Sequence, residues 1–281
     1  MNQAKEYAET NAIQFRHVAE LVDEFPKEFK KMKGRIIDIG CGPGNITRDV
    51  LLPNVDKDAV IVGADVCANM IEYAKQHYGV DDKLSYLQLD IQTPELPENL
   101  IEHFDNAVSF YALHWCKNTK QVLKNIYKLL RPGGKAIILT ISHHMIYDMY
   151  PEQENDPRFA PYVKNSMKWA PPHQGCSDAE QIMKKDLIEA KFNVEYCTNK
   201  WETFKYPSFE AFMDLVMAVN PFVHLMPIDV QKEYRKDMEE RLKSQCPVSK
   251  KDNTTDCRVS ILTTIIQKPP ISEEIDFNRH V

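Results

Sequence analysis

The short apolar run at 35–40 ends with Gly40, and two more glycines follow it at alternate positions, Gly42 and Gly44. Glycine has no Cβ, so a loop of this kind turns sharply and lets its backbone approach a ligand closely. A tight turn between a strand and a helix would not by itself require three glycines. The spacing therefore predicts a ligand-binding loop at the end of a buried strand.

Two familiar phosphate-binding patterns do not fit this loop. The dinucleotide fingerprint needs a glycine where this chain has Asn45, and no Gly-Lys-Ser/Thr follows for a P-loop. A pyrophosphate cradle, and with it a nicotinamide-linked oxidoreductase, is disfavoured. A ligand of nucleoside size remains the expectation.

Acidic side chains end the next two predicted strands. Asp65 lies about 20 residues beyond the loop, where a carboxylate accepts both hydroxyls of a ribose. Its plainer interpretation is a carboxylate at a helix N-terminus, worth about 0.3–1 kcal/mol. Asp90 ends the third strand, within reach of an adenine amino group. Two such residues behind a glycine loop favour the nucleoside site.

Strands and helices must alternate to bring these residues together. Short apolar runs predict strands at 35–40, 59–65, 84–90, 106–111 and 135–141, and helical spacing predicts helices at 46–52, 68–78 and 122–130. Such alternation predicts βαβ units and a mainly parallel sheet, which binds its ligand at the carboxyl ends of its strands.

The flanking regions follow other patterns. The first 33 residues read as helix, and residues 142–177, which lack clear periodicity, predict a lid or cap. Beyond them we expect a helix at 178–190, a strand at 193–206, helices at 207–219 and 229–243, and a last strand at 259–266.

Composition excludes several classes of protein. The 281 residues include 43% hydrophobic side chains, and 35 basic against 41 acidic residues give a net charge of −6, which disfavours nucleic acids and anionic membranes as partners. No apolar stretch is long enough to cross a membrane, so no membrane insertion is expected. The start of the chain lacks a secretory pattern, and seven scattered Cys form no C-x-x-C pair, so we expect a cytoplasmic protein without a metal site.

Four segments together resemble the class I S-adenosylmethionine (SAM)-dependent methyltransferases, at 36–44, 63–65, 89–91 and 130–134. The resemblance implies a single α/β, Rossmann-like domain over 1–281, with a mainly parallel seven-stranded sheet whose last strand is antiparallel. It divides the chain into a helical N-terminal cap (1–33), a SAM-binding core (34–142), lid and acceptor-pocket segments with the sixth strand (143–245), and a final strand region (246–268).

The same resemblance assigns roles around the methyl donor, which would leave as S-adenosylhomocysteine without help from a metal. The glycines would lie against its methionine and ribose, while Asp38 either orders the loop or meets the ammonium group. Asp65 would take the ribose hydroxyls, and Asp90 and Ile91 would flank the adenine. The full donor set is Asp38, Gly40, Cys41, Gly42, Gly44, Asn45, Asp65, Val66, Met70, Asp90, Ile91, Ser109 and Phe110.

The acceptor is predicted to be a small molecule. The segment 109–115 lacks the Asn/Asp-Pro-Pro-Tyr/Phe box of methyltransferases that act on DNA or protein glutamine. Together with 11–14 and 218–222 it resembles the juvenile hormone acid O-methyltransferases of insects. That likeness implies esterification of farnesoic acid or juvenile hormone acid, with Gln14 and Trp115 holding the carboxylate.

Chemistry agrees with that pair of side chains. A carboxylic acid with a pKa near 4–5 is already ionised at neutral pH, so no general base is needed. Catalysis can come from placing one carboxylate oxygen in line with the S–CH3 bond, about 3 Å from the methyl group. A neutral amide and an indole N–H orient the oxygens without withdrawing electron density as a guanidinium would.

Other side chains leave alternatives open. His114 could act as a base for a hydroxyl, phenol or amine acceptor, and Tyr111 could close over the donor or bond the acceptor. His143, Met217 and Phe222 complete the predicted substrate-binding set. An apolar set on the late elements suits either core or a pocket for an isoprenoid tail: Phe204, Phe209, Phe212, Met213, Met217, Phe222 and Met226.

Two further readings of the whole protein stay open. One is a SAM-dependent methyltransferase of another small lipophilic acceptor. The other is an inactive paralogue that binds a hydrophobic ligand, which the intact glycine loop and acidic residues disfavour. The sequence leaves open whether the chain forms a homodimer.

Overall fold

The computed structural model describes residues 4–249 and 251–271. Its strands are β1 (Arg35–Ile39), β2 (Val60–Asp65), β3 (Leu84–Gln88), β4 (Phe104–Phe110), β5 (Leu130–His144), β6 (Asn193–Tyr206) and β7 (Thr255–Gln267). Its α-helices are α1 (Ala4–Thr10), α2 (Ala12–Glu24), α3 (Pro26–Lys30), α4 (Ala68–Tyr78), α5 (Thr119–Leu129), α6 (Met145–Asp148), α7 (Tyr150–Asn155), α8 (Ala179–Glu189), α9 (Phe209–Val219) and α10 (Ile228–Lys243). Shorter helical turns are η1 (Thr47–Leu51), η2 (Leu52–Asn54), η3 (Glu98–Leu100), η4 (Leu113–Trp115), η5 (Ser166–Trp169) and η6 (Val223–Leu225).

The strands form one seven-stranded sheet in the order β3-β2-β1-β4-β5-β7-β6. The first five strands pair in parallel, and β7 runs antiparallel between β5 and β6. This confirms the predicted sheet with its antiparallel last strand. The strand order reverses between β1 and β4, so their carboxyl ends flank the switch point at which such sheets bind ligands.

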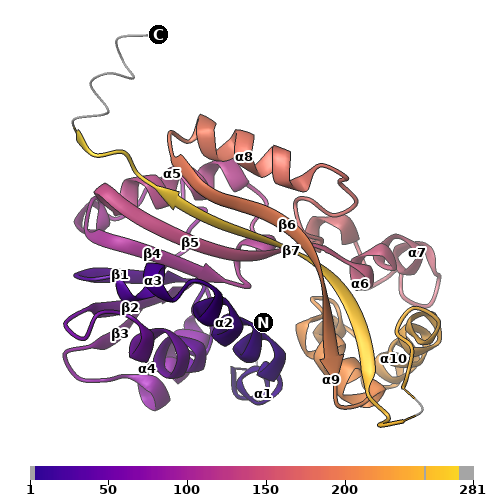
Figure 1. Ribbon diagram of the computed structural model, residues 1–281. Coiled ribbons are helices and arrows are strands. Elements are labelled where there is room, and N and C mark those ends of the chain that lie inside the picture. Colours follow the sequence, from indigo (N-terminus) through magenta and orange to yellow (C-terminus); the bar gives the residue numbers. More distant parts are fainter. Residues whose placement is uncertain (1–3, 250, 272–281) are drawn as a thin grey trace.

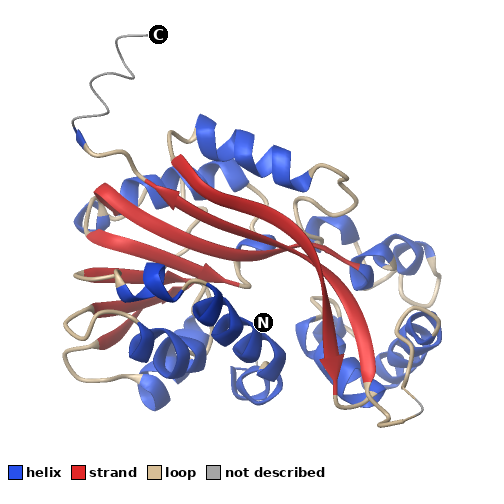
Figure 2. Cartoon of the chain, in the orientation of Figure 1, coloured by secondary structure: helices blue, strands red, loops and turns tan. Residues whose placement is uncertain are grey.

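Helices cover both faces of the sheet (Figures 1 and 2). Successive strand residues point to opposite faces, so Ile36 joins the core beneath α2, α3 and α4 while Ile37 joins the core beneath α5 and α8. Helix α5 buries Val122, Ile126 and Leu129 at helical spacing. The sheet is therefore buried on both sides, as its apolar central strands predict.

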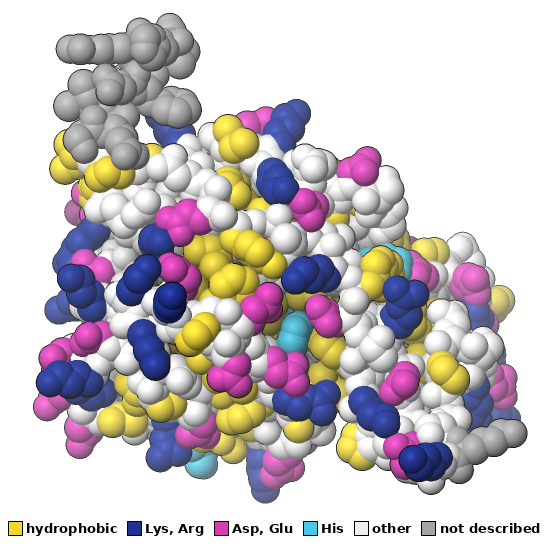
Figure 3. Space-filling view, viewed as in Figure 1, with side chains coloured by type: hydrophobic (Ala, Val, Ile, Leu, Met, Phe, Trp, Pro, Cys, Tyr) yellow, Lys and Arg dark blue, Asp and Glu magenta, His cyan; other side chains and the backbone are white. Residues whose placement is uncertain are grey.

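Strands β5, β6 and β7 extend beyond the others, and α6, α7, α9 and α10 gather at their far end (Figure 1). Tyr234 of α10 is fully buried there, and its hydroxyl donates to Gln153 of α7 at 2.7 Å. On the face shown in Figure 3, basic and acidic side chains are interspersed over the surface.

Three local expectations were only partly right. The helical N-terminus breaks at Asn11 and at Phe25, giving three helices instead of one. The predicted helix at 46–52 is a π-helical turn, η1, followed by η2, because Pro53 has no N–H to continue an α-helix. The segment 142–177 is more regular than predicted, since β5 continues to His144 and α6, α7 and η5 follow.

Candidate active site

The glycine loop lies at the carboxyl end of β1, and its three glycines have φ angles of 78°, 56° and 92°. A Cβ on Gly40 would lie 2.1 Å from Cβ of Ala112, and one on Gly44 would lie 2.6 Å from the hydroxyl oxygen of Tyr86. A Cβ on Gly42 would meet no atom closer than 3.8 Å, from the Tyr7 ring. Two glycines are therefore needed for packing as well as for their backbone angles, and Gly42 is the one with open space beside it.

Asp38 lies at the base of this loop, where its carboxylate accepts a 2.6 Å hydrogen bond from the Thr47 hydroxyl. The side chain is 2% exposed, and burial raises its pKa to about 7, with the charge of Asp65 acting in the same direction. This geometry fits the loop-ordering role, because the bond to Thr47 joins the two ends of the loop.

Asp65 ends β2 and accepts from the backbone N–H of Gly42 at 3.0 Å and from that of Cys67 at 2.8 Å. Burial raises its pKa, against the effect of these two bonds. A carboxylate has about four acceptor positions, so the side chain keeps acceptor capacity for a ribose hydroxyl. Asp90, beyond the end of β3, is exposed, and its carboxylate accepts from Gln92 N–H at 2.8 Å. The loop and both carboxylates lie at one edge of the sheet, an arrangement that fits the methyl donor implied by the resemblance.

The other predicted donor residues are mostly buried around this edge. Ile91 and Met70 are buried, as are Cys41 and Phe110, while Val66 is 59% exposed. The Ser109 hydroxyl donates to the carbonyl of Ile39 at 2.7 Å. The side-chain amide of Asn45 forms two hydrogen bonds with that of Asn11, at 3.0 and 3.1 Å, and so attaches the glycine loop to the N-terminal helices.

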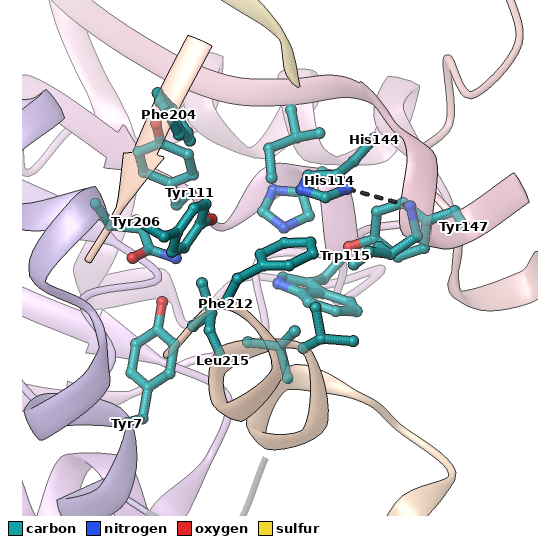
Figure 4. Close-up of a pocket in the computed structure, with 15 residues that line it drawn as sticks. Tyr7, Tyr111, His114, Trp115, His144, Tyr147, Phe204, Tyr206, Phe212 and Leu215 are labelled. Atoms are coloured by element: carbon teal, nitrogen blue, oxygen red, sulfur yellow. Dashed lines mark hydrogen bonds between the residues drawn. The ribbon is translucent and has the colours of Figure 1, made fainter. Parts of the chain in front are cut away.

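A cavity with about 580 Å3 of empty space, part of it open to solvent, adjoins the donor edge (Figure 4). Its walls come from α1, α2, the β4–η4 turn, β5, α6, β6 and α9. The lining residues are Tyr7, Gln14, Tyr111, His114, Trp115, Ile141, His144, Ile146, Tyr147, Phe204, Tyr206, Phe212, Leu215, Val216 and Val219. The wall is largely aromatic and aliphatic, as for a lipophilic ligand.

Tyr7 joins the two halves of the site, because it lines this cavity and also lies beside Gly42. Burial, with a contribution from Asp65, raises the pKa of its phenol to about 12. A ligand in the cavity and a ligand on the glycine loop would therefore be neighbours across Tyr7.

Two polar atoms in the cavity wall are buried without a hydrogen-bond partner, Oε1 of Gln14 and Nδ1 of His114. Buried polar atoms are rarely left unpaired, so both are expected to find partners in a bound ligand. The Gln14 amide can turn to present either its oxygen or its NH2 group. The Trp115 ring lies beside that of His114, with centroids 5.0 Å apart and the ring planes tilted by 42°. Gln14, His114 and Trp115 all line the one cavity.

Burial sets the protonation of the histidines. It lowers the pKa of His114 to about 3, with Lys117 and His144 adding to the effect. Burial also lowers the pKa of His144 to about 3, with His143 acting in the same direction. Both rings are neutral at physiological pH, and His114 is a very weak base.

Tyr111 follows β4 with a φ of 55°, a left-handed backbone that is uncommon outside glycine and is concentrated at functional sites. Its N–H donates to the carbonyl of Leu139 at 2.8 Å, and its hydroxyl is hydrogen-bonded to Nδ1 of His17. His17 was not among the predicted site residues, and neither were Tyr7, Tyr147 and Tyr206. No motif marks these residues, although His17 is one helical turn from Gln14.

Three predicted substrate-binding residues lie outside the cavity wall. Phe222 is buried against Tyr150, with ring centroids 5.2 Å apart, and Met217 packs against the core from α9. Nε2 of His143 lies 3.3 Å from the carboxylate of Asp148. Of the apolar set, Phe204 and Phe212 line the cavity, whereas the buried side chains of Met213, Phe222 and Met226 belong to the core.

Residues 4–249 and 251–271 lack two kinds of feature. They contain no group of three or more His, Cys, Asp or Glu side chains placed to hold a metal ion. Within the same ranges, every helix is too short or too polar for a membrane span.

Residues 37–136 match the family described as "Methyltransferase domain". The chain is 32% identical over 245 residues to juvenile hormone acid O-methyltransferase of Drosophila melanogaster, covering 84% of this chain and 81% of the relative. It is 28% identical over 254 residues to the Bombyx mori protein of the same name, covering 88% and 90%.

Among solved structures, a Bacillus halodurans protein named as a methyltransferase superposes with a TM-score of 0.55. The superposition covers 88% of this chain and 99% of the other at 16% identity, which supports the Rossmann-like methyltransferase fold.

Proposed function

Because the chain belongs to the juvenile hormone acid O-methyltransferase family of SAM-dependent methyltransferases, we propose that it methylates the carboxylate of a sesquiterpenoid acid. Family membership makes it a SAM-dependent O-methyltransferase. The acceptor that we propose is farnesoic acid or juvenile hormone acid, and the product is the methyl ester.

The observation that carries this proposal is the placement of Gln14, His114 and Trp115 at one apolar cavity. The lining residues divide by chemistry into these polar side chains and the aliphatic residues of α9, and Figure 4 shows His114, Trp115 and Leu215 around the same cavity. An amphipathic acid matches this division, with its carboxylate at the polar side chains and its chain along α9.

The residues of this chain would act mainly by placement. The donor supplies an electrophilic methyl group on a sulfonium, and the glycine loop, Asp65 and Asp90 would hold it. Gln14 NH2 and the Trp115 indole N–H would orient the carboxylate so that one oxygen forms the new C–O bond as the C–S bond breaks. Its electron pair goes to sulfur, and no proton moves. The apolar walls exclude water, which would otherwise solvate the attacking oxygen.

The alternative in which His114 is a general base has less support. An efficient base has a pKa near the working pH, and burial holds that of His114 at about 3. A neutral imidazole can still donate one hydrogen bond to a carboxylate, so His114 fits an orienting role. The alternative of an inactive paralogue finds no support in the glycine loop, which is complete.

Purified protein incubated with SAM and farnesoic acid, followed by mass spectrometry, tests the proposal. We expect farnesoic acid methyl ester and an equal amount of S-adenosylhomocysteine. Farnesol, which has the same chain and no carboxylate, is the matched control and should remain unmethylated. Methylation of farnesol but not of the acid, or SAM-independent binding of the acid without turnover, would contradict it.

A further inference from the structure

His17 is not part of the cavity wall, yet it contacts that wall through Tyr111. It lies on α2 three residues after Gln14, so both side chains are on neighbouring parts of one helical face. Its Nδ1 is hydrogen-bonded to the Tyr111 hydroxyl, and the two ring centroids are 5.9 Å apart. The bond joins α2 to the end of β4, two elements that are 94 residues apart in the chain.

The His17 ring is held on its other side by β6. Its centroid is 5.1 Å from that of Phe204, in an edge-on arrangement. The charged groups facing it are Glu202 on β6 and Glu20, Glu24 and Arg16 on α2. Burial lowers the pKa of His17 while the acidic neighbours oppose this shift. A neutral His17 ring can form the hydrogen bond with the Tyr111 hydroxyl in either tautomer, because Nδ1 then either donates or accepts.

Tyr111 in turn sets the direction of the next four residues. Its left-handed backbone begins the turn into η4, which carries His114 and Trp115. Its N–H is fixed to the Leu139 carbonyl, so the hydroxyl bond to His17 is a second point of attachment. Because Gln14 lies on α2 and Trp115 on η4, the placement of these two elements sets the placement of the two side chains.

We infer that His17 is a positioning residue for methyl transfer, acting through Tyr111 to keep Gln14 of α2 in register with Trp115 of η4. This inference rests on the proposed function, in which those two side chains hold the acceptor carboxylate. A displacement of about 1 Å in reacting groups can lower turnover about 100-fold, so one bond far from the donor can matter.

The test uses four variants of the full chain. His17→Leu removes the polar ring at similar size, and His17→Asn keeps a polar atom near the position of Nδ1. Tyr111→Phe removes only the hydroxyl, and the fourth variant combines His17→Leu with Tyr111→Phe. His103→Leu is the matched control, because His103 precedes β4 at the opposite edge of the sheet, where it contacts Arg35.

We expect His17→Leu and Tyr111→Phe each to lower kcat with farnesoic acid about 10–100-fold, with SAM affinity within threefold of wild type. The double variant should be no worse than either single one, since both remove one bond. His17→Asn should recover most of kcat, and His103→Leu should change nothing. A His17→Leu protein within threefold of wild-type kcat, or one losing SAM affinity in proportion to turnover, would overturn the inference.

A second readout keeps the inference separate from the choice of acceptor. The chain has three tryptophans, so 15N-tryptophan labelling gives three indole N–H signals. His17→Leu should shift the Trp115 signal, assigned with Trp115→Phe, and leave those of Trp169 and Trp201 in place, and His17→Asn should restore it. If wild type makes no ester, the proposed function fails, while the Trp115 signal still decides the role of His17. An unmoved signal overturns that role.

Discussion

The side-chain amides of Asn11 and Asn45 exchange two hydrogen bonds, at 3.1 and 3.0 Å, and both residues are buried. Asn11 lies at the break between α1 and α2, and Asn45 ends the glycine loop. The pair therefore attaches the N-terminal helices, which carry Tyr7 and Gln14, to the proposed donor site. It also explains why Asn45 stands where a dinucleotide-binding loop would have glycine.

Loss of this pair should destabilise the protein non-additively. Asn45→Ala leaves the buried Asn11 amide without partners, which costs about 1–3 kcal/mol in the free energy of unfolding. Asn11→Ala should cost a similar amount. The double variant removes both unpaired groups and should cost less than the sum of the single changes. Urea denaturation of the four proteins measures this, and strictly additive losses would show that the two amides act independently.

The pKa of Asp38 predicts a pH-dependent stability. Its folded-state pKa of about 7 lies above the usual 3.8. As pH rises from 4 to 7, the unfolded chain loses this proton while the folded chain keeps it. The contribution to the free energy of unfolding therefore falls by up to about 1.4 kcal/mol per pH unit in that window, and levels off above it.

Asp38→Asn removes the titrating group and so should lose this dependence. The free energy of unfolding is measured by denaturation without SAM for wild type and for Asp38→Asn. From pH 5 to pH 8, the value for wild type should fall relative to the value for Asp38→Asn. The exposed Asp81→Asn serves as control and should show no such trend. A constant difference for Asp38→Asn would mean that the buried carboxyl is ionised throughout.

The rate of methyl transfer should not depend on a base. A carboxylic acid acceptor is ionised above about pH 6, and burial keeps His114 neutral with a pKa of about 3. With SAM and farnesoic acid both saturating, kcat should be flat from pH 6 to pH 8.5. A tenfold rise per pH unit with a midpoint near 7 would instead assign a proton-accepting role to a histidine.

Much of the fold was predictable because parallel strands here are short, apolar and separated by amphipathic helices. The helix 68–78 was predicted to the residue, and so was the strand 193–206, which is long and antiparallel. The N-terminal helices and β5 were less predictable. The break at Phe25 has a local signal, because Pro26 follows it and begins α3. Nothing local shows that Pro132 and Gly133 lie within an extended strand. That outcome depends on pairing with distant segments, such as β7 against β5.

The site was predictable where residues follow a strand end and unpredictable where tertiary contacts assemble it. Tyr111, His114 and Trp115 follow the end of β4, whereas Gln14 of α2 was predicted only from the family resemblance, and all four line one cavity. His17 was missed because its partner is 94 residues away. Met217 and Phe222 were predicted from their apolar character, and Phe222 also from the resemblance of the segment 218–222. Neither signal distinguishes a side chain that faces the cavity from one that faces the core.

The proposed carboxylate pair predicts a loss of turnover without a loss of SAM binding. Gln14→Ala and Trp115→Phe each remove one donor, and removal of such a donor typically costs about 100-fold or more in rate. Trp115→Phe keeps an aromatic ring beside His114 and Tyr147. Calorimetry should give SAM affinities within threefold of wild type. Trp201→Phe, at a 53% exposed tryptophan, controls for loss of an indole.

The wall of the cavity on α9 should limit the length of the acceptor. Val219 lines the cavity at the end of α9, whereas Met217, two residues earlier on the same helix, does not. Val219→Phe should raise KM for farnesoic acid about tenfold or more, because the added ring occupies space that the chain needs. Octanoic acid, which is shorter, should keep its KM. Met217→Phe is the matched control, because it introduces the same side chain on the same helix. It should leave the KM for farnesoic acid and the KM for octanoic acid near those of wild type. If Met217→Phe discriminates between the two acids and Val219→Phe does not, the acceptor chain runs along the other side of α9, and the cavity described here is not its binding site.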